Sequence, residues 1–205
     1  MSMIVKKNLS QLEKLRNILG EQRGILRTSD LAKNNIPRTY LSILQEKGEI
    51  ERVSRGIYKS IDSIEDEFFS FQARYKTSVY SHETALYLHD LADRTPLSYT
   101  VTVPIGYHST SLKESPHKIF YLNRALFDIG LTIMTSPHGN EIKATGLERT
   151  IIDLLRSRKK MDIQLVNKAL NEYIKRKERN INLLYAYAEK FRIQKILRQY
   201  IEILL

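Results

Sequence analysis

The hydrophobic and polar positions of residues 1–60 predict a small helical unit closed by a hairpin. Leucine and isoleucine recur at helical spacing over residues 9–19, which predicts a first helix that ends at Gly20. An extended piece follows at residues 24–27. Two short runs that alternate apolar and polar residues, at 50–53 and 57–59, then predict a hairpin around Ser54-Arg55-Gly56.

Between the first helix and the hairpin, the chain predicts two short helices separated by a tight break. Thr28 and Ser29 can cap the first of these helices. The Asn34-Asn35 pair can end it, because asparagine tolerates the left-handed backbone conformation. Pro37 can open the second helix, since the first helical position needs no backbone donor. Together with the hairpin, these segments predict a winged helix-turn-helix.

The second of these helices has its buried side at Leu41 and Leu44, so small polar residues and one arginine face outward. Such a face can enter the major groove of DNA, led by Arg38, because Glu46 stands at the far end of the helix. The hairpin would contact phosphates or the adjacent minor groove. The alternative is a protein-docking module in which the same charges form a solvated face. We therefore expect DNA contacts from Ser29, Arg38, Thr39, Ser42, Ile43, Arg52, Ser54, Arg55 and Lys59.

After residue 60 the pattern predicts a larger mixed α/β domain that ends in helices. An acidic run at 65–67 suits a helix N-terminus, and Ser81 can cap another helix. Thr145 and Glu148 predict a capping box at the start of a third. Strands are expected at residues 78–80, 99–103, 119–122 and 131–134. The sequence therefore predicts an α+β protein with two domains, residues 1–60 and 61–205.

The net charge of +10 is unevenly distributed along the chain. Residues 1–60 hold 12 Lys and Arg against 6 Asp and Glu, residues 61–155 hold 8 against 12, and residues 156–205 hold 13 against 5. A basic balance is typical of proteins that bind nucleic acid. The C-terminal charges either form a second nucleic-acid surface or are the solvated face of helices. The surface would comprise Arg156, Arg158, Lys159, Lys160, Lys168, Lys175, Arg176 and Lys177.

Composition and motifs count against several other classes of protein. The chain has no cysteine, which excludes disulfides and thiolate metal sites. We find no apolar run that could span a bilayer and no signal-peptide core, and we expect a cytosolic protein. Phosphate-loop, dinucleotide-binding and zinc-protease motifs do not occur, and we expect no cofactor and no metal. Core or surface positions are expected for all five histidines, His82, His89, His108, His117 and His138.

A weak catalytic pattern is formed by Asp128, Glu141 and Lys143, which have the loose spacing of a metal-dependent nuclease. Two carboxylates can hold a divalent ion while the lysine stabilises charge at the phosphate. A pattern this short arises by chance in most basic proteins of this length. We therefore expect a protein that is not an enzyme, with nuclease activity as an alternative.

Four segments in order resemble the AbiEi family, the antitoxins of abortive-infection, type IV toxin–antitoxin systems. They are Arg55-Gly56-Ile57-Tyr58, the SHETA segment at residues 81–85, the strand at 99–104, and TGLERTIIDLL at 145–155. The turn before the second helix, Asn-Asn-Ile-Pro, departs from the Gly-Val-Ser-like sequence expected there.

The resemblance implies a bacterial repressor whose winged helix binds repeated sites in its own promoter. It also implies antitoxin activity in the C-terminal domain, against a nucleotidyltransferase-like toxin with which no tight complex forms. We expect a monomer in the absence of DNA and leave open whether binding to the repeated sites is cooperative.

Overall fold

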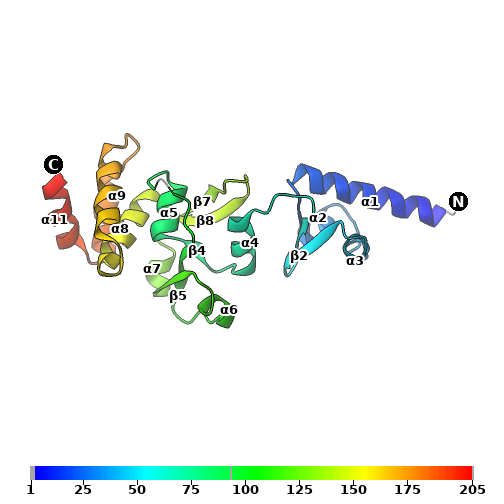
Figure 1. Ribbon diagram of the computed structural model, residues 1–205, viewed down its shortest axis with the longest axis horizontal. Helices are drawn as coiled ribbons and strands as arrows, with labels where there is room; N and C mark the ends of the chain where they lie inside the picture. Colours follow the sequence, from blue (N-terminus) through cyan, green and yellow to red (C-terminus); the bar gives the residue numbers. More distant parts are fainter. Residues whose placement is uncertain (1–2, 93, 205) are drawn as a thin grey trace. The chain divides into compact units, whose positions relative to one another are not determined.

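The computed structural model describes residues 3–92 and 94–204, with side chains from residue 11 to residue 202 apart from residue 93 (Figure 1). The chain divides into two compact units, Met1–Arg74 and Tyr75–Leu205. This division lies beyond the boundary at residue 60 that the sequence indicates. None of the helices in the described parts of the chain is both long and apolar enough to cross a bilayer.

The N-terminal unit is a winged helix-turn-helix followed by one further helix. Its strand order is β1-β3-β2, with both pairings antiparallel. The β2–β3 pair is the predicted hairpin, and β1 is the extended piece expected beside it. The elements are α1 (Met3–Glu21), β1 (Ile25–Arg27), α2 (Thr28–Lys33), α3 (Thr39–Glu46), β2 (Ile50–Ser54), β3 (Ile57–Ser60) and α4 (Glu67–Arg74).

The core of this unit is built from the leucines that the helical spacing places on one side of each helix. Leu15 of α1, Leu26 of β1, Leu31 of α2 and Leu44 of α3 are fully buried and belong to one cluster. Each such side chain contributes about 1.5–3 kcal/mol to folding when it leaves water. The core therefore fixes α3 against α1 and the sheet.

The break between α2 and α3 forms as predicted, but the caps differ. Asn35 has the left-handed φ of 52° that stops a helix. Thr28 and Ser29 do not cap α2, because both lie inside its first turn. The N-cap residue is instead Arg27, whose backbone N–H donates to Oδ2 of Asp30 in the first turn at 2.9 Å. Pro37 was expected at the first helical position of α3 but lies two residues before it, because the helix begins at Thr39 with Arg38 as the N-cap.

Helix α4 belongs to the N-terminal unit by its contacts, although the sequence prediction put it in the second domain. Asp66 caps it, with Oδ1 accepting the N–H of Phe69 at 3.0 Å. The Arg27 guanidinium lies 5.2 Å from the centroid of the Phe69 ring. These contacts tie the aromatic side of α4 to the start of α2.

The C-terminal unit contains a mixed five-stranded sheet in the order β6-β5-β4-β8-β7. The β5–β6 and β4–β8 pairs are parallel, and the other two pairs are antiparallel. An α+β fold is therefore confirmed. The strands are β4 (Val79–Tyr80), β5 (Thr100–Pro104), β6 (Lys118–Leu122), β7 (Leu131–Thr135) and β8 (Glu141–Thr145).

The helices of this unit pack around α8, which Figure 1 shows between α5 and α9. Ile151, Leu154 and Leu155 of α8 are fully buried in a cluster that also takes in the helices after it. Gly130 approaches α8 so closely that a Cβ there would lie 2.8 Å from the Cβ of Arg149. The helices are α5 (His82–Leu88), α6 (Thr110–Lys113), α7 (Arg124–Phe127), α8 (Leu147–Ser157), α9 (Ile163–Lys175), α10 (Ile181–Lys190) and α11 (Gln194–Leu204), with a 3-10 turn η1 (Arg158–Lys160).

The predicted capping box at the start of α8 is wrong. Gly146 is the N-cap residue and provides no side-chain cap. The Thr145 hydroxyl is 2.7 Å from the Thr150 hydroxyl instead. Glu148 Oε1 accepts the backbone N–H of Asn180 at 2.9 Å. Glu148 thus joins α8 to the start of α10, a contact that local spacing does not reveal.

Candidate DNA-binding surface

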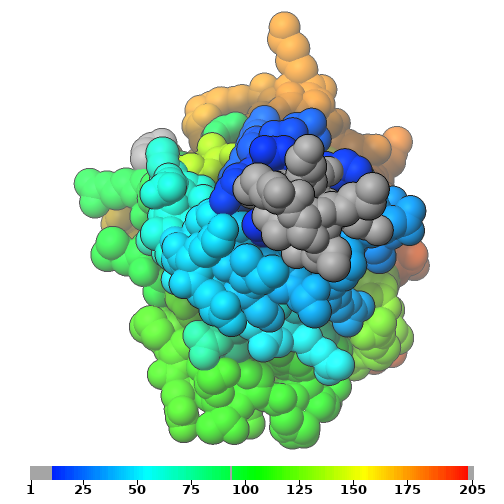
Figure 2. All heavy atoms as spheres, turned by 90° about the vertical axis from the view of Figure 1, so that its right-hand side faces the viewer, coloured from blue at the N-terminus to red at the C-terminus, as the bar shows by residue number. Residues whose placement is uncertain are grey.

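Helix α3 separates its side chains into a buried side and an open side. Tyr40, Leu41 and Leu44 are buried in the core of the winged unit. Arg38, Thr39, Ser42, Gln45 and Glu46 are all exposed. In Figure 2 the light-blue and cyan atoms of α3 and the hairpin make up much of the visible surface of this unit. The outward face is therefore polar and small, with its only arginine at the N-terminal end.

Two of the three carboxylates that weaken the positive charge near this face are paired within the fold. Arg16 of α1 donates from Nε and Nη2 to the two oxygens of Glu49, at 2.8 and 2.7 Å. This contact lowers the pKa of the Glu49 carboxyl and raises that of Arg16. Glu51 is paired with Lys59. Glu46 at the C-terminal end of α3 is left as the exposed carboxylate of the helix, so the N-terminal end is the better match for a phosphate-lined groove.

The hairpin is short, and its turn packs against the start of α2. The backbone N–H of Thr28 donates to the carbonyl of Gly56 at 2.9 Å. Gly56 has a φ of 78°, and a Cβ there would lie 2.8 Å from the Thr28 hydroxyl. Only glycine satisfies both conditions. Arg52 and Arg55 are nevertheless exposed on the same hairpin.

Three of the residues that were predicted to contact DNA are only partly exposed to solvent. Lys59 is half-buried, with Nζ 2.8 Å from Glu51 and 3.2 Å from Glu65, and these carboxylates raise its pKa. Ile43 is half-buried against the core of the unit. Ser54 is half-buried, and its hydroxyl has no hydrogen-bond partner in the structure. The exposed members of the set are Ser29, Arg38, Thr39, Ser42, Arg52 and Arg55.

The second basic surface loses two of its arginines to contacts within the C-terminal unit. Arg176 donates to the backbone carbonyls of His89 and Asp90, which ties the end of α9 to the end of α5. Arg156 is paired with buried Asp153 at 3.4 Å, and its guanidinium lies 5.6 Å from the Phe191 ring centroid. Arg158 is half-buried, and Lys175 is paired with Glu172. Lys159, Lys160, Lys168 and Lys177 remain exposed.

The three residues of the nuclease alternative do not form one site. Asp128 and Lys143 line the same pocket, whereas Glu141 does not line it. The Asp128 carboxylate is 3.2 Å from Arg124 Nε. Over residues 3–92 and 94–204, no three histidine or carboxylate side chains come together in a way that could hold a metal ion.

Three of the motif segments meet in the core of the C-terminal unit. His82 is fully buried, with Nδ1 2.9 Å from the Ser81 hydroxyl and Nε2 3.0 Å from the Ser157 hydroxyl. Thr102 of β5 donates to the Ser81 hydroxyl at 2.8 Å. The His82 ring stacks on Phe120 at 3.8 Å between centroids. These side chains form a closed structural network, and its burial lowers the pKa of His82 to about 4.

Residues 13–59 match the family described as "Transcriptional regulator, AbiEi antitoxin". The segment of the N-terminal unit that matches is thus similar to the AbiEi antitoxins. The match covers α2, α3 and the hairpin, and it confirms the resemblance to the AbiEi antitoxins over that segment. It supports an antitoxin or regulator role, and the family description names no enzyme activity.

Curated proteins and solved structures add nothing to the AbiEi match. No curated protein matches the chain. Among solved structures, the chain is similar to the crystal structure of the RV2827C protein from Mycobacterium tuberculosis. The two are 13% identical with a TM-score of 0.45, over 90% of this chain and 79% of that one. A similarity at this level carries no information about function.

Proposed function

We propose that the chain is the antitoxin of a type IV abortive-infection system, acts in the cytosol, and represses its own operon by binding promoter DNA through the winged unit. Arg38, Thr39 and Ser42 read bases in the major groove, and Arg52 and Arg55 contact the backbone. The observation that carries the proposal is the open side of α3, where Arg38, Thr39 and Ser42 are exposed opposite a buried leucine core. The family match of residues 13–59 supports the same role.

The antitoxin part of the proposal rests on the family match. The functional partner would be a nucleotidyltransferase-like toxin whose effect is countered without a tight complex between the two proteins. We further propose that the free protein is a monomer and that repeated promoter sites recruit more than one copy. The alternative function is a protein-docking module, for which the exposed hairpin arginines would form an ordinary solvated face.

Replacing Arg38 tests the base-reading role directly. Arg38→Ala should weaken binding to the cognate promoter site by about 1–3 kcal/mol and relax discrimination at one base position. The reason is that the side chain is exposed at the leading end of α3. Binding of the full chain to its upstream DNA and to a panel of single-base variants measures both effects.

Lys47→Ala is a matched control for this substitution, because Lys47 is also exposed but stands at the other end of α3. It removes the same charge, and it should leave base discrimination unchanged. Equal losses for the two variants on cognate and shuffled DNA would contradict base reading by Arg38. A stable complex with a protein partner, together with no DNA shift at low salt, would favour the docking alternative.

Arg55 is expected to act through phosphate charge alone. Arg55→Ala should weaken binding to all DNA sequences by a similar factor and reduce the slope of log affinity against log salt by about 0.9, the value for one phosphate contact. Titrations at several salt concentrations measure the slope. Lys14→Ala, at an exposed position on α1, serves as the charge control and should keep the wild-type slope. An unchanged slope in Arg55→Ala would rule out this contact.

A further inference from the structure

Charged side chains of the C-terminal unit line a pocket of about 680 Å³ beside α7 and the β7–β8 hairpin. That volume lies within the usual range for small-molecule sites, about 300–1,000 Å³. All of its lining residues belong to the C-terminal unit. None of these residues belongs to α3 or to the β2–β3 hairpin, through which we propose that DNA is bound.

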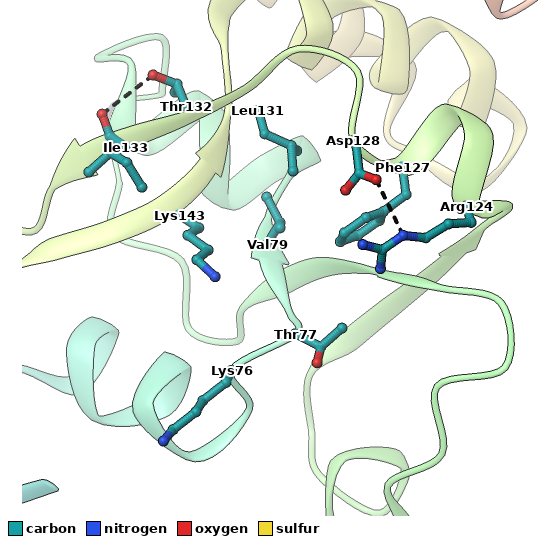
Figure 3. Close-up of a pocket in the computed structure, with 10 residues that line it drawn as sticks. All are labelled: Lys76, Thr77, Val79, Arg124, Phe127, Asp128, Leu131, Thr132, Ile133 and Lys143. Carbon is teal, nitrogen blue, oxygen red and sulfur yellow. Dashed lines mark hydrogen bonds and ion pairs between the residues drawn. The ribbon is translucent and has the colours of Figure 1, made fainter. Parts of the chain in front are cut away.

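Three cations from three separate segments of the chain line this pocket. Lys76 precedes β4, Arg124 begins α7, and Lys143 lies in the middle of β8. Figure 3 shows the Arg124 side chain extending from α7 into the space and the Lys143 side chain entering it from β8, whereas the Lys76 side chain extends away from both. Residues 61–155 hold only 8 Lys and Arg against 12 Asp and Glu, so three of the eight meet at one place in an acidic stretch. That arrangement favours an anionic ligand.

Asp128 is the one carboxylate among the lining residues, which leaves a formal charge of 3 − 1 = +2. Its ion pair with Arg124 joins side chains that are 58% and 71% exposed. A pair this exposed contributes little, about 0–1 kcal/mol. Arg124 can therefore exchange the Asp128 carboxylate for a ligand phosphate at small cost.

The other side chains that line the pocket include hydroxyl and apolar groups, and an inorganic phosphate ion would leave the apolar groups uncovered. Thr77 and Thr132 bring hydroxyl groups to the pocket, and Val79, Leu131 and Ile133 form an apolar wall. Ile133 is 57% exposed, although it lies in a strand. A ligand that covers this wall has an apolar, flat part as well as anionic groups.

We propose that this pocket binds a nucleoside phosphate. Its phosphates lie against Arg124 and Lys143, and its sugar and base cover the apolar wall. Lysine and arginine are the usual partners of phosphate oxygens. This site is additional to the DNA-binding role of the winged unit and does not depend on it.

Calorimetric titration of the full chain with ATP, GTP and pyrophosphate tests the proposal, with a chelator present and at about 0.15 M salt. We expect ATP or GTP to bind with a Kd of about 1 mM or tighter, and pyrophosphate to bind at least about tenfold more weakly. Equal affinity for pyrophosphate, or no binding of either nucleotide, would overturn the proposal.

Removing a positive and a negative charge from the pocket in separate variants makes the test specific to this site. Lys143→Gln should weaken nucleotide binding by about tenfold or more. Asp128→Asn should strengthen it, because the competing carboxylate is lost. Lys113→Gln, at an exposed position of α6 outside the pocket, should leave it unchanged. Equal effects at Lys113 and Lys143, or weaker binding in Asp128→Asn, would contradict the site.

Two variants, each measured with both ligands, show whether the nucleotide site is distinct from the DNA-binding surface. Arg38→Ala should bind the nucleotide as tightly as the wild-type chain, and Lys143→Gln should bind promoter DNA as the wild-type chain does. Loss of nucleotide binding in Arg38→Ala would place the nucleotide on the winged unit and overturn the assignment to the pocket. Failure of promoter binding alone would leave the nucleotide result standing.

Discussion

Arg149→Ala should lower the free energy of unfolding of the C-terminal unit by about 3–5 kcal/mol, the usual cost of breaking a buried ion pair. Arg149 and Asp153 are both fully buried, with Nε 3.0 Å from Oδ2. The Arg149 guanidinium also donates to the carbonyls of Leu126 and Ile129 and lies 4.5 Å from the Phe191 ring centroid. Its removal leaves a buried carboxylate and two carbonyls without that partner.

Arg124→Ala is the matched control, because Arg124 and Asp128 form an ion pair with the same four-residue spacing but exposed side chains. It should cost less than about 1 kcal/mol. Denaturant unfolding followed by circular dichroism gives both values. Equal losses of unfolding free energy in the two variants would contradict the claim that burial makes the Arg149–Asp153 ion pair the more costly one to break.

Acid should destabilise the C-terminal unit through His82. Its pKa is lowered from 6.5 to about 4, first of all by burial. The neutral form is therefore the folded form, whereas the unfolded chain takes up a proton below pH 6.5. The stability that neutral His82 provides is complete above that pH. It should fall by about 3 kcal/mol as the pH decreases from 6.5 to 4, at about 1.4 kcal/mol for each pKa unit.

His82→Asn isolates this contribution. Asparagine accepts the left-handed φ of 49° at this position better than other residues do, apart from glycine. The variant should be less stable at pH 7 but should lose much less stability between pH 6.5 and pH 4. His108→Asn, at an exposed position, should retain the wild-type pH dependence. Parallel curves for the wild-type chain and His82→Asn would contradict the assignment.

The parts of the fold that follow local periodicity could be predicted from the sequence. The spacing of Leu41 and Leu44 gives the buried side of α3, and the outward positions follow from it. The Asn34-Asn35 break depends on backbone preferences that two residues determine by themselves. The hairpin around Arg55 follows from strand alternation and one glycine.

Features that depend on distant contacts could not be predicted. Lys59 is held by Glu65, which lies beyond the hairpin, so strand alternation gives no sign that its charge is already paired. Arg149 is buried because Leu126, Ile129 and Phe191 surround it, although its position in the TGLERT segment looks like that of any helix arginine. Helices α6 and α7 have four residues each, too few for a periodic pattern to appear.

The pocket beside α7 also illustrates this limit. Asp128 and Lys143 stood together in the sequence-based nuclease pattern with Glu141, but the fold brings Lys76 and Arg124 to them and leaves Glu141 outside. Which charges meet depends on the order of the strands in the sheet, and no local spacing determines that order. Lys143 therefore belongs to the proposed anion site, where Asp128 competes with the ligand for Arg124, and the sequence pattern does not form a metal centre.

Binding of the wild-type chain to its own upstream DNA, compared with shuffled DNA of the same composition at about 0.15 M salt, tests the central claim most directly. A winged helix that reads bases through Arg38 and its neighbours should prefer the upstream sequence by about 10³-fold or more. Equal affinity for the two DNAs, or no binding to either at low salt, would contradict the account of the first unit as a DNA reader.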